Sequence, residues 1–215
     1  RSVLVTGVQT CALPICRFMS KSTVIAISRQ YGSGGREIGK RLAEKLHIPF
    51  YDKELILLAA KESGYDESLF EKLDEENKRP LSYLLSMYSN SMSHYDLSLN
   101  DQLFLIQSKV ISDLAKESCV IIGRCADYVL RNQVNVLSVF IHAPIADRLA
   151  RSIDDYHDDP ETVSEKIRRV DKNRATYYNY YANEKWGQLT NYDLTMNSSI
   201  LGIDGCVDVL YEACK

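Results

Sequence analysis

A short apolar segment that leads directly into a glycine-rich turn constrains the fold of this chain most strongly. Residues 23–28 (TVIAIS) are mostly β-branched or apolar, the pattern of a strand buried on both faces. Residues 31–35 (YGSGG) follow as a turn, after which Ile38, Leu42 and Leu46 recur at helical spacing. The sequence therefore predicts the first strand, turn and helix of an α/β fold.

Further short apolar segments alternate with amphipathic helical patterns along the rest of the chain. We expect strands over residues 48–51, 119–123, 136–143 and 192–196, and helical stripes within 103–114, 145–153, 163–170 and 207–214. In the second stripe, Pro144 occupies the first helical position and Ile145, Leu149 and Ile153 share one face. This alternation predicts a three-layer α/β domain around a parallel sheet.

Composition excludes several classes of protein. The formal net charge is -3 and 26% of the residues are charged, so no general basic surface for nucleic acid or membrane is expected. No apolar run approaches the ~20 residues that cross a bilayer. The six cysteines show neither a CxxC pair nor metal-ligand spacing, which favours free thiols in a reducing cytoplasm. An anionic ligand must then be bound by a local basic cluster.

The first 18 residues are set apart from the fold. They lack the cationic and apolar regions of a signal peptide, and residues 2–16 resemble translated sequencing-adapter read-through. We expect residues 1–18 to be a non-native extension and 19–215 to form a single domain. Within that domain, residues 53–100 are expected to form a helical insert that binds the acceptor, and residues 152–185 a lid.

The glycine turn has the features of a phosphate-binding loop. Glycine permits positive φ and close approach to an anion, and the following helix presents unpaired N–H groups. The candidate donor-phosphate residues are Tyr31, Gly32, Ser33, Gly34, Gly35, Arg36 and Glu37. The alternative is an ordinary tight turn between a strand and a helix.

The P-loop consensus GxxxxGK[ST] is not met as written. Aligned with it, Arg29 stands at the first glycine, Gly35 at the lysine and Arg36 one place later, at the magnesium-binding hydroxyl, with Glu37 following. Arg36 supplies a charge, although its planar fork is not equivalent to an ammonium group. The metal ligands are therefore unknown.

Two further clusters carry basic residues. Arg124 follows the third expected strand and is suited to bidentate phosphate contact, the alternative being a surface pair with Asp127. Arg168, Asp171 and Arg174 are spaced one helical turn apart, so the carboxylate could hold both guanidinium groups. The alternative for this second cluster is a solvated helix face.

The aromatic run at 177–181 favours packing of the lid base onto the sheet. The alternative interpretation is a surface on which a base or a partner stacks.

The order of these segments resembles the cytidylate-kinase-like family, within the P-loop nucleoside monophosphate kinases. The resembling segments are IAISRQYGSGGREIGKRLAEKL, IPFYD, CVIIGRCADYVL, VFIHAPIADRLAR, RRVDKNRATYYNYY and WGQLTNYDLTMNSSILGID. The resemblance implies a three-layer α/β/α P-loop kinase fold with a five-stranded parallel sheet. It also implies ATP as the phosphoryl donor, Mg²⁺, and a nucleotide and a small-molecule acceptor as partners.

The resemblance assigns roles by position. The implied catalytic residues are Arg36, Arg124, Arg168, Asp171 and Arg174. The implied acceptor contacts come from Asp52, Lys53, Arg124 and Asp127, and the implied lid contacts from Arg148 and Arg151. The adenine side is implied at Asn197, Ser198 and Ser199. Departures occur in the acceptor pocket. Cys125 replaces an aspartate of cytidylate kinases, Lys53 replaces a serine, and an apolar residue near Leu58 replaces an arginine.

These residues lead to one expected function and two alternatives. The expected function is ATP-dependent phosphoryl transfer to a nucleoside monophosphate, with CMP or dCMP as the candidate acceptor. One alternative is a regulatory module that binds a nucleotide with weak or no catalysis, because the lysine and hydroxyl of the consensus are absent. The other is a kinase of a non-nucleotide small molecule.

Overall fold

A five-stranded parallel sheet forms the centre of the molecule. The computed structural model describes residues 23–52, 99–132 and 135–215. The strands are β1 (Thr23–Arg29), β2 (Phe50–Tyr51), β3 (Cys119–Ile122), β4 (Asn135–His142) and β5 (Leu194–Asn197). Their order is β2-β3-β1-β4-β5, and every pair is parallel. The predicted sheet is confirmed, with β1 and its glycine turn at the centre.

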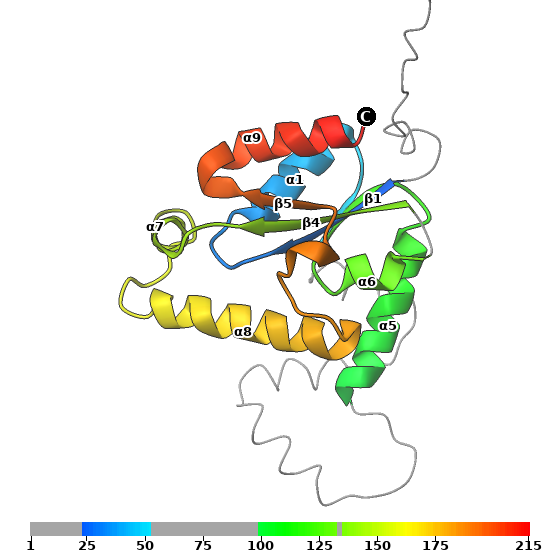
Figure 1. Cartoon of the computed structure of the whole chain (residues 1–215), viewed down its shortest axis with the longest axis horizontal. Helices are drawn as coiled ribbons and strands as arrows, with labels where there is room; N and C mark the ends of the chain where they lie inside the picture. Colours follow the sequence, from blue (N-terminus) through cyan, green and yellow to red (C-terminus); the bar gives the residue numbers. More distant parts are fainter. Residues whose placement is uncertain (1–22, 53–98, 133–134) are drawn as a thin grey trace, which may run out of the picture.

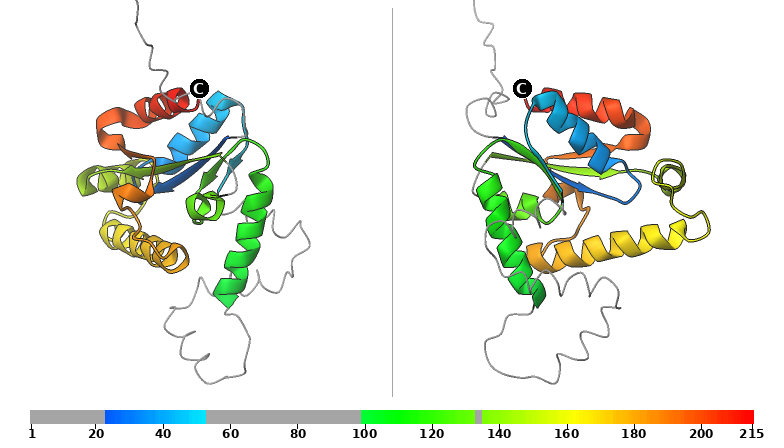
Figure 2. Two further views of the ribbon diagram at one scale, coloured as in Figure 1. Left: turned by 45° about the vertical axis from the view of Figure 1, so that its right-hand side comes forward. Right: turned by 180° about the vertical axis from the view of Figure 1, so that it is seen from behind.

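Helices cover both faces of the sheet, giving three layers (Figure 1). One face carries α1 (Gly35–Leu46) and α9 (Ser198–Ala213), and the other carries α5 (Leu99–Leu114), α6 (Ala126–Leu130) and α8 (Val163–Ala182). Helix α7 (Ile145–Asp154) lies beyond the carboxyl end of β4, and a short 3-10 helix, η2 (Leu189–Asn191), precedes β5. Both further views in Figure 2 show α8 running beneath the sheet, on the side opposite α1 and α9.

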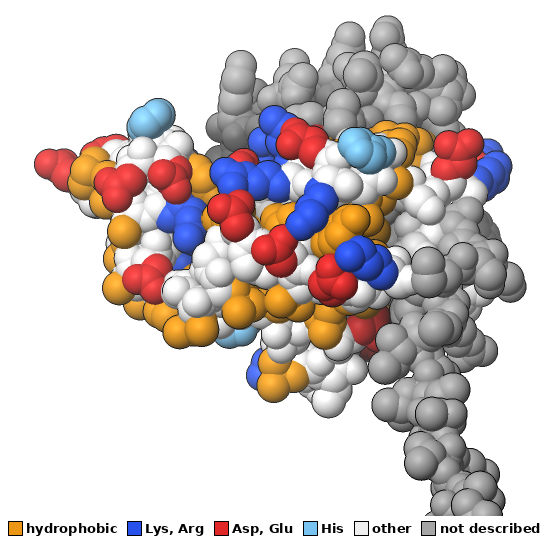
Figure 3. All heavy atoms as spheres, turned by 90° about the horizontal axis from the view of Figure 1, so that it is seen from above, with side chains coloured by type: hydrophobic (Ala, Val, Ile, Leu, Met, Phe, Trp, Pro, Cys, Tyr) orange, Lys and Arg blue, Asp and Glu red, His pale blue; other side chains and the backbone are white. Residues whose placement is uncertain are grey.

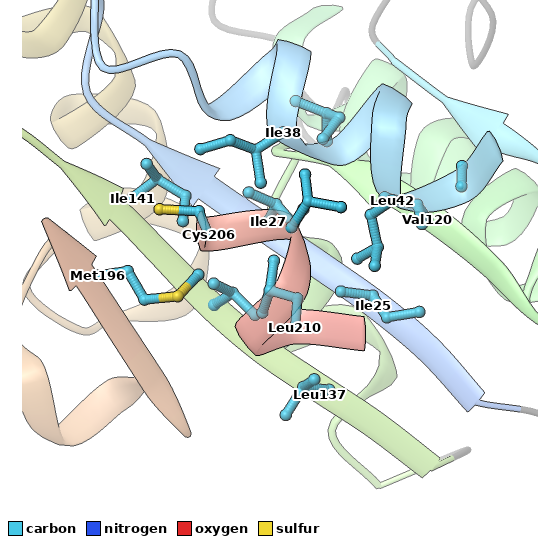
Figure 4. Packing of buried hydrophobic residues seen from close by; sticks show 14 residues of the cluster. Ile25, Ile27, Ile38, Leu42, Val120, Leu137, Ile141, Met196, Cys206 and Leu210 are labelled. Atoms are coloured by element: carbon cyan, nitrogen blue, oxygen red, sulfur yellow. The ribbon is translucent and has the colours of Figure 1, made fainter. Parts of the chain in front are cut away.

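Strand β1 is apolar throughout because both of its faces are covered. Ile25 and Ile27 contact Ile38 and Leu42 of α1 and Leu210 of α9, and none of these side chains is more than 1% exposed. Figure 4 shows this cluster packed between the two helices and the sheet. The alternate residues of β1 belong to a second buried cluster, formed with α5 and α6 on the opposite face. The continuous apolar run is thus explained by burial on both sides.

Helix α7 buries a face that carries polar residues. Ile145 is 49% exposed, whereas Arg148 and Ser152 are the buried residues of this helix. The reason is that α7 packs against the glycine turn, whose backbone needs polar neighbours, rather than against the apolar sheet. The apolar face that carries Ile145 is therefore more exposed than the face that carries Arg148 and Ser152.

Several expectations lie outside the described residues. These are the extension at 1–18 and nearly all of the acceptor-binding insert at 53–100, including Lys53 and Leu58. In the part of the chain that the structure describes, no helix has the length and apolar character needed to cross a membrane. Cys119, Cys125, Cys206 and Cys214 are free thiols.

Candidate active site

The glycine turn has a backbone that only glycine adopts readily at two positions. Gly32 and Gly34 have φ values of 76° and 75°, in the left-handed region. A Cβ atom at Gly32 would lie 2.6 Å from the carbonyl oxygen of Arg148. The turn therefore packs directly onto α7, and the absence of side chains permits that contact.

Helix α7 adds two arginines to this turn. Arg151 donates from Nη1 to the carbonyl oxygen of Gly32 at 3.0 Å. Arg148 is 7% exposed, and its Nε is buried without a hydrogen-bond acceptor among the described residues. A buried guanidinium N–H without an acceptor is costly, so an anion bound beside it would be stabilised.

The carboxylate of Asp171 lies between the glycine turn and two guanidinium groups. It accepts the backbone N–H of Tyr31 at 2.7 Å and Nη1 of Arg148 at 2.5 Å. Nη1 of Arg174 lies 3.9 Å from the same carboxylate and donates to the carbonyl oxygen of Arg29 at 2.9 Å. Burial lowers the pKa of Arg174, an effect that the charge of Asp171 opposes. The turn thus already binds an anionic group, supplied by the protein itself.

Which charged residues of α8 reach the glycine turn depends on the face of the helix that they occupy. Ile167 and Tyr178 are buried, and Asp171 and Arg174 lie between them at helical spacing on the same face. Arg168 is one position away from that stripe and is exposed. The expected contact of Arg168 with Asp171 is therefore replaced by contacts of Asp171 with Arg148 and Arg174.

The side chain of Tyr31 connects the turn to the region expected to act as a lid. Its hydroxyl donates to Oδ2 of Asp158 at 2.8 Å, and Nζ of Lys166 lies 5.3 Å from its ring centroid. The ring of Tyr156 meets it edge-on at 5.9 Å. Burial raises the pKa of Tyr31, whereas at Asp158 burial is outweighed by the hydrogen bonds from Lys166 and Tyr31, which lower its pKa.

Arg36 and Asp52 join α1 to the end of β2. Arg36 donates to Oδ2 of Asp52 from Nε at 3.0 Å and from Nη2 at 2.5 Å. The side chain of Arg36 is 65% exposed, and that of Asp52 is buried. Glu37 is exposed and accepts a hydrogen bond from Arg41. Arg36 thus joins the first turn of α1 to the residue that follows β2.

The loop after β3 is built on three consecutive residues with positive φ: Gly123, Arg124 and Cys125. The guanidinium carbon of Arg124 lies 5.4 Å from the ring centroid of Tyr177. Asp127 is buried and accepts the hydroxyl of Tyr178 at 2.7 Å, so the alternative pairing of Arg124 with Asp127 does not occur. Burial raises the pKa of the Asp127 carboxyl, against the effect of that hydrogen bond.

The aromatic run of α8 packs inside the molecule. Tyr181 stacks on Phe104 of α5 with centroids 3.9 Å apart, and Tyr177 donates to Gln107 at 3.2 Å. Tyr178 is 2% exposed. The packing interpretation of this run is thus supported, with Tyr180 alone standing 69% exposed.

The three residues at the expected adenine side have different environments. The Asn197 side chain accepts the N–H of Ser199 and caps α9, and the Ser198 hydroxyl donates to the carbonyl oxygen of Ser33 at 2.7 Å. The Ser199 hydroxyl is buried without a hydrogen-bond partner among the described residues. Ser198 therefore fixes the start of α9 against the glycine turn.

Sequence reasoning missed Arg29 as a site residue. Its carbonyl oxygen binds Arg174, and its side chain lies against both Gly35 and Gly123. The signal was its position directly before the glycine turn. Its relation to Gly123 depends on the pairing of β1 with β3 and could not be read from sequence.

The parallel sheet, with the glycine turn at the end of its central strand, places the molecule in the α/β class. The chain belongs to the cytidylate kinase-like family, whose description matches residues 24–200. No curated protein matches the chain.

Several solved structures are similar to this chain to different degrees. An uncharacterized protein from Eubacterium ventriosum is 27% identical, with a TM-score of 0.69 over 90% of this chain and 98% of the other. The protein TT1252 from Thermus thermophilus is 13% identical, with a TM-score of 0.50 over 91% and 99% of the two chains. A shikimate kinase from Bacteroides thetaiotaomicron is 14% identical, with a TM-score of 0.45 over 89% and 96%.

Proposed function

We propose that this protein transfers the γ-phosphoryl group of ATP to a nucleoside monophosphate, with CMP or dCMP as the candidate acceptor. The observation that carries this proposal is the environment of Asp171. A backbone N–H of the glycine turn and the guanidinium groups of Arg148 and Arg174 already surround one anionic group. Donors arranged in this way are suited to phosphate oxygens.

In the proposed reaction, an oxygen of the acceptor phosphate attacks the γ-phosphorus of ATP. The new oxygen–phosphorus bond forms as the bond from that phosphorus to the β,γ-bridging oxygen breaks, and ADP leaves with the electron pair. No general base is needed, because the attacking oxygen is already anionic. The protein therefore contributes in-line positioning, charge neutralisation and exclusion of water.

The roles of the side chains follow from where the structure places them. Residues 32–36 would bind the donor phosphates through backbone N–H groups, while Arg148, Arg151 and Arg174 neutralise charge from the side of α7 and α8. Arg124 would contact the acceptor phosphate from the loop after β3. Asp52, held by Arg36, would orient the acceptor or a hydrated magnesium ion.

Magnesium fits this arrangement only as an ion held mainly by phosphate and water. Among the described residues, no three His, Cys, Asp or Glu side chains gather around one point. Mg²⁺ usually retains several waters and binds one or two carboxylates together with substrate phosphates, so a complete protein cage is not required. Asp52 is the carboxylate that we assign to this role, and the ion would neutralise charge on the donor phosphates.

A kinase with a different acceptor is the second candidate, and Cys125 favours it. Burial raises the pKa of this thiol to about 12, so it stays uncharged at neutral pH. It cannot replace the ionised aspartate of cytidylate kinases as a hydrogen-bond acceptor for cytosine. A pocket that loses such a partner loses discrimination for that base.

A coupled assay of ADP release tests the proposal. Purified protein is incubated with ATP, with and without Mg²⁺, against a panel of nucleoside monophosphates and small-molecule alcohols and acids. We expect magnesium-dependent turnover with at least one monophosphate. Turnover confined to a non-nucleotide acceptor would favour the second candidate, and ATP binding without turnover across the panel would instead indicate a regulatory nucleotide-binding module.

A further inference from the structure

The departure from the P-loop consensus involves two positions that face each other in the structure. The consensus has glycine at its first position and lysine after its second glycine. This chain has Arg29 at the first position and Gly35 at the lysine position. The cation and the small residue have therefore exchanged places.

The geometry of Gly35 gives this exchange a physical basis. A Cβ atom built on Gly35 would lie 2.5 Å from Cβ and 3.0 Å from Cγ of Arg29. Real Cβ atoms do not approach each other that closely, so the two positions cannot both carry side chains in this backbone. The first part of the Arg29 side chain lies where a lysine at position 35 would leave the helix.

The far end of Arg29 is accommodated by a second glycine. Nη1 of Arg29 lies 2.4 Å from the position that a Cβ atom would take on Gly123, the residue after β3. Gly123 has a φ of 72°, so glycine also suits its backbone. Because β1 pairs with β3, the Arg29 guanidinium is brought between the glycine turn and the loop that carries Arg124.

The backbone of Arg29 is fixed from the opposite side. Its carbonyl oxygen accepts Nη1 of Arg174 at 2.9 Å. The residue before the turn is thus bound by α8, and its side chain starts from a defined place at the carboxyl end of the central strand. A partly buried guanidinium in such a place acts as a fixed charge with oriented donors.

From these contacts we infer that Arg29 replaces the P-loop lysine, supplying from the strand the phosphate-binding cation that the consensus supplies from the helix. This inference rests on the proposed function, and it names Arg29 as a catalytic residue of the same site. Arg36, the nearest cation in sequence to the lysine position, is directed to Asp52 instead.

The experiment measures binding of ATP and of inorganic tripolyphosphate by calorimetry, together with the melting temperature of each variant. Arg29→Met should weaken the binding of both ligands about 10- to 100-fold, the effect of losing one charge-assisted hydrogen bond. Arg29→Lys should retain most of the affinity. Lys116→Met is the matched control, because Lys116 is exposed before β3, at the other end of the sheet.

The exchange itself is tested with three further variants. Gly35→Lys alone should lower the melting temperature, because its side chain meets Arg29. The double variant Arg29→Gly/Gly35→Lys restores the consensus arrangement, and we expect it to melt higher than Gly35→Lys and to bind tripolyphosphate more tightly than Arg29→Gly. If Arg29→Met fails to fold, the comparison of the double variant with Arg29→Gly decides the question.

Two results would overturn the inference while leaving the proposed function intact. One is unchanged binding of both ligands by Arg29→Met. The other is a double variant that binds no more tightly than Arg29→Gly. Wild-type protein that binds neither ATP nor tripolyphosphate would contradict the proposed function itself, and this inference with it.

Discussion

At the scale of single residues, the arginines of the site differ in the set of groups that they contact. Arg148 is bound to a carboxylate, Arg174 to a carbonyl oxygen and a carboxylate, and Arg124 lies over an aromatic ring. Arg124 also donates a hydrogen bond to the side chain of Tyr177, and a neutral hydroxyl is exchanged for a ligand at lower cost than a carboxylate. Removal of Arg124 should therefore affect the chemistry strongly and the fold little.

Replacing Arg124 with alanine tests this distinction. If Arg124 neutralises charge in the transition state, turnover should fall by about 3–5 orders of magnitude, as for an arginine finger. The melting temperature should change little, and we expect the same loss of turnover for Arg174→Ala. Steady-state kinetics with the acceptor found in the panel provide the measurement, with exposed Arg169→Ala as the control. Near-native turnover of Arg124→Ala would contradict its assigned role.

The buried carboxyl of Asp127 makes stability depend on pH. Because burial raises its pKa, the folded protein holds this proton more tightly than the unfolded chain, whose pKa is about 3.9. Its contribution to stability is thus fully present below that value and is lost as pH rises through the folded pKa. We expect Asp127→Asn to flatten the decline in the free energy of unfolding above about pH 4.

Urea unfolding of wild type and Asp127→Asn between pH 4 and 7 measures this effect, and Asp208→Asn serves as the control because Asp208 is exposed and paired with Lys45. Parallel pH profiles for wild type and Asp127→Asn would show that the carboxyl is not held protonated in the folded state.

At the level of residues, the sequence was sufficient to predict contacts that depend only on the spacing of residues along one helix. Asp171 and Arg174 reach the turn because they lie one helical turn apart on the inward stripe of α8. Arg168 does not, because the choice of inward stripe depends on what α8 packs against. Arg29 was missed for a related reason: its neighbours Gly35 and Gly123 come from another element and from another strand's loop.

At the scale of elements, the glycine turn packs directly against α7. Gly32→Ala should destabilise the fold by about 1–2 kcal/mol from its left-handed backbone alone. The clash with the Arg148 carbonyl oxygen should add to that. Gly205→Ala is the matched control, since Gly205 lies within α9 with ordinary contacts, and alanine there should be neutral or stabilising. Equal melting temperatures for the two variants would contradict the packing described.

The contact between α5 and α8 depends on stacked aromatic rings. Phe104→Leu removes the stack on Tyr181 while retaining an apolar side chain. It should lower the free energy of unfolding by about 0.5–1.5 kcal/mol, the usual value of an aromatic pair beyond its buried area. Leu105→Ala, at a position 54% exposed, should change it by less than about 0.5 kcal/mol. If the two variants are equally stable in urea, the stack does not anchor α8.

Elements were predictable where hydrophobic periodicity decided them. The central strands β1, β3 and β4 were predicted because a strand covered on both faces is largely apolar. The face that α7 buries could not be predicted from the apolar stripe of the helix, because α7 packs polar residues against the glycine turn. The short helix α6 follows residues with positive φ and carries too few residues for a periodic pattern.

At the scale of the whole molecule, anion binding is a local property. The net charge is -3, and the face seen in Figure 3 shows acidic and basic side chains interspersed. The cationic groups of the site are concentrated instead at the carboxyl edge of the sheet, where β1, β3 and β4 end beside one another. Ligands of open α/β sheets bind at this edge. The family resemblance implied a five-stranded parallel sheet, but the strand order could not be read from hydrophobic patterns.

A crystal structure with a non-hydrolysable ATP analogue tests the central claim most directly. We predict that its β- and γ-phosphates lie against the backbone N–H groups of residues 32–36, with the guanidinium groups of Arg29 and Arg174 directed toward them. An analogue bound elsewhere on the molecule, with the glycine turn still bound to Asp171, would contradict the account.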